Sequence, residues 1–178
     1  NAAREITILS QMAGITTTEM QRSAFAARSV GADMKELSDV FRDVNDKVGD
    51  FLAEGGGELV QFFDEIAPRV GVTADQFRKL NGKEALQLYV DTLEKANLSQ
   101  AEMTTHMERI ASDSTKLIPL LANNGAEFER LAKRADELGL VLDELDLTHL
   151  NEMKTSLSEL GAISDATSNA IGAVFAPF

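Results

Sequence analysis

The chain has 178 residues, of which 44% are hydrophobic and 26% charged, a balance typical of a single domain that can bury a core. Its 17 Lys and Arg residues against 29 Asp and Glu residues leave a formal net charge of −12, which repels phosphate backbones and anionic membranes, so we expect no nucleic-acid partner. The absence of cysteine excludes a disulfide framework, a thiol nucleophile and a thiolate metal site.

Helix signals dominate from the first residues onward. The chain begins at Asn1, and no basic stretch followed by an apolar core opens it, so we expect no signal peptide and expect the chain to be part of a longer one. No run of alternating β-branched residues occurs, and the predicted fold class is all-α. We predict helices near residues 4–13, 18–29, 32–54, 58–67, 74–80, 83–97, 100–111, 114–122, 126–138 and 143–175.

Three of these helices begin with a capping-box spacing, in which a Ser or Thr is followed three residues later by Glu or Gln. This spacing satisfies free backbone N–H groups at a helix N-terminus. The pairs are Thr16 with Glu19, Thr73 with Gln76, and Ser99 with Glu102.

The strongest periodicity defines what we call the 34–51 stripe. Its apolar residues recur at steps of 3, 4, 3, 4 and 3, as at the a and d positions of a heptad: Met34, Leu37, Phe41, Val44, Val48 and Phe51. The opposite face carries mostly acidic side chains and is predicted to be solvated. A helix over 32–54 would be roughly 34 Å long, and three consecutive glycines at 55–57 then end it.

Short connections predict that the helices up to about residue 122 fold back on one another into a compact multi-helix lobe, residues 3–122. After Asn123, Asn124 and Gly125 the chain becomes acidic, with seven acids and one base between residues 136 and 159. We predict that residues 123–178 form an arm of long amphipathic C-terminal helices.

A second periodic set, the 150–160 stripe, runs along this arm at steps of 3, 4 and 3: Leu150, Met153, Leu157 and Leu160. The two stripes are our candidate helix interfaces, and self-association through them is a prediction. The last nine residues are apolar apart from Gly and Pro, too few to span a bilayer alone. We expect membrane contact only if that apolar segment continues; a core-packing terminus is the other interpretation.

No motif for catalysis is specific. His106 has Ser112 and Asp113 nearby in sequence, but Ser112 lacks the Gly-x-Ser-x-Gly turn that exposes a nucleophile. Asp146, His149 and Glu152 share a helix face, yet a di-iron bundle needs a second Glu-x-x-His helix, which is missing. We therefore predict no catalytic residues, metal or cofactor.

Two loop motifs are also incomplete. The 43–54 segment superficially resembles a calcium loop, but Lys47 and Val48 stand where an oxygen donor and a glycine are needed, so helix is favoured. Gly82 and Lys83 are followed by Glu84 rather than Ser or Thr, so no phosphate loop is present. The Phe and Met residues at helical spacings are predicted to pack in the core, with a partner groove as the alternative.

The amino-acid sequences of several segments resemble those of one protein family. Residues 43–103 read DVNDKVGDFLAEGGGELVQFFDEIAPRVGVTADQFRKLNGKEALQLYVDTLEKANLSQAEM, residues 110–125 read IASDSTKLIPLLANNG, and residues 14–20 read GITTTEM. They resemble the tail length tape measure protein of long-tailed phages and prophages. The resemblance covers roughly residues 14–125 and contains no catalytic motif.

The resemblance implies a structural component of a phage tail, a segment that helps to set tail tube length during assembly and is released at DNA ejection. It implies the tail tube protein, tail assembly chaperones and tail-tip proteins as partners, and a location in the tail interior of the virion, with the host cytoplasm during assembly. A protein that sets tail length by its own length would do so most simply as one long helix, whereas glycines break this chain repeatedly.

Two other functions stay open from the residues. A helical protein-binding module, adaptor or chaperone-like and without catalysis, is the alternative. A hydrolase with carboxylate chemistry needs only two well-placed acids, but no pair among the 29 is singled out by the sequence.

Overall fold

Helix α3 lies at the centre of the structure, where it contacts α1, α2, α4 and α5. The computed structural model describes the backbone of residues 2–175 and the side chains of residues 2–163. The α-helices are α1 (Ala2–Ala13), α2 (Thr17–Arg28), α3 (Met34–Glu54), α4 (Gly82–Lys95), α5 (Gln100–Ile110), α6 (Ile118–Glu137) and α7 (Glu144–Phe175). Strands are absent from this described part, and the predicted all-α fold is confirmed.

Capping boxes start several helices, as predicted. The backbone N–H of Glu19 donates to Thr16 Oγ1 over 3.1 Å, and the Thr16 N–H donates to Glu19 Oε2 over 3.3 Å. Ser99 begins α5 in the same way. Asp33 and Asn81 form two further boxes, at the starts of α3 and α4, which the predictions did not include.

Three predicted α-helices take other forms, wholly or in part. The 58–67 segment is a turn and two α-helical residues followed by the π-helix η1 (Phe62–Ile66), which continues into the 3-10 helix η2 (Ala67–Val70). Pro68 has no N–H to donate, and Gly71 ends η2 at φ +73°. The predicted 74–80 helix is reduced to the four-residue 3-10 helix η3 (Ala74–Phe77), begun by Thr73. The start of the predicted 114–122 helix is also 3-10, η4 (Ser114–Leu117).

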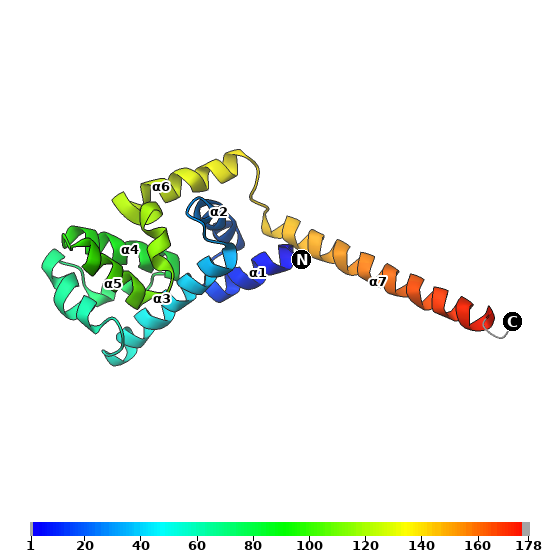
Figure 1. The fold of residues 1–178 in the computed structure, drawn as a ribbon, viewed down its shortest axis with the longest axis horizontal. Coiled ribbons are helices and arrows are strands. Elements are labelled where there is room, and N and C mark those ends of the chain that lie inside the picture. Colours follow the sequence, from blue (N-terminus) through cyan, green and yellow to red (C-terminus); the bar gives the residue numbers. More distant parts are fainter. Residues whose placement is uncertain (1, 176–178) are drawn as a thin grey trace.

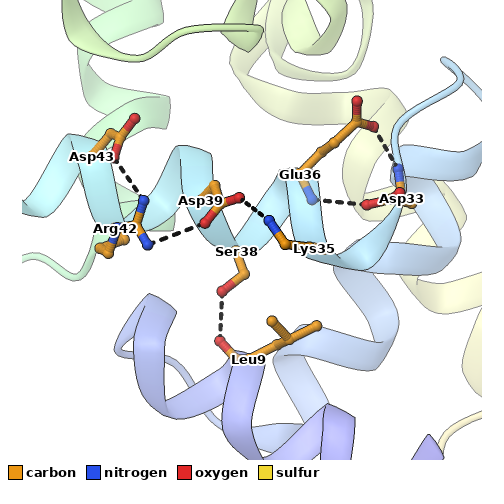
Figure 2. Close-up of polar contacts among 8 residues, drawn as sticks. All are labelled: Leu9, Asp33, Lys35, Glu36, Ser38, Asp39, Arg42 and Asp43. Carbon is orange, nitrogen blue, oxygen red and sulfur yellow. Dashed lines mark hydrogen bonds and ion pairs between the residues drawn. The ribbon is translucent and has the colours of Figure 1, made fainter.

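The two faces of α3 differ in the way its periodicity predicts. On the polar face, Lys35 contacts Asp39 Oδ2 over 2.9 Å, and Arg42 contacts Asp39 Oδ1 over 3.1 Å (Figure 2). Facing α1, the buried Ser38 hydroxyl donates to the Leu9 carbonyl over 2.8 Å (Figure 2). This bond satisfies a buried hydroxyl and ties α3 to α1.

An aromatic cluster packs the end of α3 against η1, η3 and α4. Phe51 stacks on Phe63 with 4.2 Å between ring centroids, and Phe62 lies 4.2 Å from Tyr89. Phe77 meets both Phe62 and Phe63 edge-on, the geometry that the ring quadrupoles favour. The π-helical turn allows this packing because Phe62, Phe63 and the nearby Ile66 are all buried within one short segment.

Helix α6 bends sharply in its first half. From Ala122 to Gly125 the backbone leaves helical geometry, and the last three residues of that stretch have positive φ. The break that Asn123, Asn124 and Gly125 predict is therefore confirmed. The second half of α6 packs on α2 and α4 with Phe128 and Ala135 buried.

Helix α7 projects from the lobe as a single straight arm (Figure 1). Its 32 residues correspond to roughly 48 Å at 1.5 Å per residue. The division at residue 123 stays a prediction about domain organisation, but residues 126–137 pack against the lobe, and the projecting part begins with α7.

Candidate interaction surfaces

The 34–51 stripe lies inside the lobe. Leu37, Phe41 and Val44 have no exposed surface, Val48 is buried, and Met34 and Phe51 are half-buried against the core. Because α1 and α4 cover this face of α3, it is not a free surface, and the expectation that it meets another chain is corrected. The same apolar periodicity serves an intramolecular core equally well.

The 150–160 stripe, in contrast, is exposed along α7. Leu150 is 43% exposed, Met153 61%, Leu157 65% and Leu160 61%. Large apolar side chains are individually common on surfaces, but a row of four at heptad spacing is typical of a helix that pairs with another helix. The structure thus leaves this stripe available to a partner.

Contacts with the lobe hold the start of α7 and the segment just before it. Leu147 is 2% exposed in the first turn of α7. Upstream, Gln21 of α2 exchanges two hydrogen bonds with the backbone of Leu142, and Arg22 Nε contacts Asp136 Oδ1 over 2.8 Å. The Gln21 contact could not be predicted from the sequence, because no periodic pattern distinguishes a buried glutamine from the exposed polar residues of the same helix.

Other large apolar side chains are exposed elsewhere on the described residues. Ile8 and Met12 on α1 are 43% and 40% exposed. Leu138 and Leu140, in the connection between α6 and α7, and Leu145 on α7 are exposed as well. The apolar surface available to a partner therefore extends beyond the 150–160 stripe.

The residues considered for nucleophilic catalysis do not come together. His106 is 5% exposed and its Nδ1 is buried without a hydrogen-bond partner among the described residues, whereas Ser112 is exposed. Burial, reinforced by the charge of Arg109, lowers the pKa of His106, while Glu102 and Glu65 oppose this shift. The arrangement holds a neutral imidazole in the core and lacks the bonded nucleophile and base of a triad.

His106 belongs instead to a packing contact between α4 and α5. The buried Tyr89 hydroxyl donates to the His106 carbonyl over 2.7 Å. Burial raises the pKa of Tyr89 well above its usual range, so it stays protonated and able to donate.

Neither metal motif of the sequence forms a cluster. Among the side chains of residues 2–163, no three His, Asp or Glu groups lie close enough to hold a metal ion. Asp146, His149 and Glu152 are all exposed on α7. The calcium-like 43–54 segment is continuous α-helix within α3, as its periodicity favours.

None of the described helices is both long and apolar enough to cross a bilayer. The apolar 170–178 segment lies outside the residues whose side chains are described.

In comparisons with known proteins, no family model, curated protein or solved structure matches this chain.

Proposed function

We propose that this chain is a structural, non-catalytic component of a phage tail, a segment of the tape measure protein that sets tail tube length and is released at DNA ejection. Its partners would be the tail tube protein, assembly chaperones and tail-tip proteins, in the host cytoplasm during assembly and then in the tail interior. The sequence resemblance of residues 14–125 to tape measure proteins supports this proposal.

The observation that carries the proposal is α7. A rod of roughly 48 Å that leaves a folded lobe and exposes an apolar stripe is suited to spanning length and to meeting other helices. This geometry also changes the length that the segment would contribute to the tail. A folded lobe followed by an arm occupies far less length than an extended chain of the same residues.

The alternative is a helical protein-binding module, adaptor or chaperone-like, without catalysis. The exposed 150–160 stripe favours it, since such a face binds a partner helix equally well outside a tail.

Tail length in electron micrographs distinguishes these functions. An in-frame deletion of all 178 residues from the encoding phage or prophage would shorten the tail by roughly 270 Å if the segment is fully extended and helical. Deletion of α7 alone is the matched comparison and would shorten the tail by about 48 Å in either case. If the lobe stays folded, the full deletion would shorten the tail by that length plus the width of the lobe, well short of roughly 270 Å. Normal-length tails from both deletions would overturn the ruler function and leave the binding module.

A further inference from the structure

An open groove of about 440 Å³ lies between α4 and α6, with η3 and α2 at its edges. Its floor is apolar. Leu121 and Phe128 are each 2% exposed, and Leu80 and Leu88 are half-buried and reach the open side. This groove is separate from the 150–160 stripe.

The bend in α6 shapes one wall of this groove. Gly125 has φ +72°, and a Cβ there would lie 2.4 Å from Gln87 Oε1. The Gln87 amide group is held in place because it donates to the Leu121 carbonyl over 2.8 Å and to Asp91 Oδ1 over 2.7 Å. The wall is thus fixed before any partner arrives, which lowers the ordering cost of binding.

The rim of the groove is strongly acidic. Glu19, Glu84, Asp91 and Glu129 bring four carboxylates to it, against the single ammonium of Lys83. That ammonium lies 4.9 Å from the centre of the Phe128 ring, at the floor. An apolar floor with an excess of three negative charges around it is complementary to an apolar side chain with cationic neighbours.

We propose that this groove docks a short segment of a partner protein that carries one or two apolar side chains flanked by Lys or Arg. The apolar side chains would occupy the floor over the half-buried Leu80 and Leu88, beside the Phe128 ring that Lys83 covers, and the cations would meet the rim. A second copy of this chain is a poor occupant, since its exposed apolar stripe lies on an arm with seven acids and one base between residues 136 and 159. The inference goes beyond the tail function and does not rest on it.

The test is a selection from a random 12-residue peptide library against the immobilised full chain, followed by titration of the enriched peptides. We expect a consensus of an apolar residue flanked by Lys or Arg. In spectra of the isotope-labelled chain, the peptides should shift backbone amides of residues 80–91 and 121–129 most strongly.

Two triple variants with the same net charge then locate the binding. The rim variant is Glu19→Gln, Asp91→Asn and Glu129→Gln, and the glutamine amide introduced at position 19 can still close the capping box. The control neutralises three exposed acids elsewhere, Glu58→Gln, Asp64→Asn and Glu108→Gln.

The rim variant should weaken binding at least five-fold relative to the control variant, with unchanged helicity in both. Enrichment of no peptide, or of acidic or uncharged peptides only, would overturn the proposal. Equal weakening in the two triple variants, or amide shifts concentrated on α7, would do the same.

Discussion

Gln21 and Leu142 are 121 positions apart in the sequence and are joined by two hydrogen bonds. Gln21 Nε2 donates to the Leu142 carbonyl over 2.8 Å, and the Leu142 N–H donates to Gln21 Oε1 over 2.9 Å. One side-chain amide therefore satisfies both backbone groups of a residue just before α7. This pairing holds the connection between α6 and α7 against α2.

Replacing Gln21 by Ala should loosen the connection between α6 and α7. Because the Leu142 backbone groups lose both partners, we expect a loss of about 1–3 kcal/mol in unfolding free energy. Hydrogen exchange at residues 138–143 should accelerate, while exchange in α3 stays slow. Gln11→Ala, at an exposed position of α1, is the matched control and should change neither quantity appreciably. Unchanged exchange at 138–143 would contradict the role assigned to Gln21.

Two glycine-to-alanine changes should affect stability in opposite directions. A Cβ at Gly82 would lie 2.2 Å from the Phe41 carbonyl oxygen, a backbone atom of α3 that cannot move aside independently. Gly82→Ala should therefore destabilise the chain by at least about 2 kcal/mol, through a forced separation of α3 and α4. Gly49→Ala, within α3 and with nothing within 4 Å, should stabilise it by about 0.5–1 kcal/mol. Urea unfolding measures both, and a neutral Gly82→Ala would refute the close approach.

The buried imidazole of His106 predicts a stability that declines in mild acid. Burial lowers the pKa of His106 in the folded chain, so the unfolded chain takes up a proton first as the pH falls below about 6.5. The contribution of neutral His106 is complete above that pH and is progressively lost below it.

The decline should be visible between pH 7 and pH 5. Hydrogen bonds that they accept lower the pKa of four carboxyl groups, Glu36, Asp39, Glu102 and Glu127, whose contributions are lost only below about pH 4.5. Unfolding free energies of the wild type and His106→Gln, measured across pH 5–7, should therefore differ in slope, with the flatter curve in the variant. Parallel curves would argue against a buried neutral His106.

The exposed stripe on α7 predicts self-association. At micromolar concentration, sedimentation should show an oligomer for the wild type and a monomer for Leu157→Glu with Leu160→Glu, since charges in a heptad seam prevent pairing. Thr155→Glu with Ser158→Glu adds the same charge elsewhere on α7 and should keep the oligomer. A wild type that stays monomeric would contradict this prediction.

The parts of the fold that could be predicted from the sequence are mostly those that neighbouring residues determine. The Thr16 and Ser99 capping boxes and the break at residues 123–125 depend on neighbouring residues alone, so they are legible in the sequence. The π-helical turn at Phe62–Ile66 is not, because its geometry is stabilised by aromatic packing on Phe77 and Tyr89 from later in the chain.

The candidate surfaces show the same limit. Heptad spacing looks alike in the 34–51 and 150–160 stripes, but only tertiary packing decides that α1 and α4 cover the first stripe and leave the second exposed. The groove over Leu88 and Phe128 is formed by residues from four elements, and no local pattern brings them together.

The placement of α1 beside the start of α7 has a mechanical consequence. The two helices are in contact where α7 begins (Figure 1). Arg4 shares a surface hollow with Lys154 and Thr155. A force that pulls α1 and α7 apart acts directly on this contact, and the Gln21–Leu142 pairing is the next link between the arm and the lobe. Because α1 packs more extensively on α3 than on α7, the arm would separate from α1 under tension before α1 leaves the lobe.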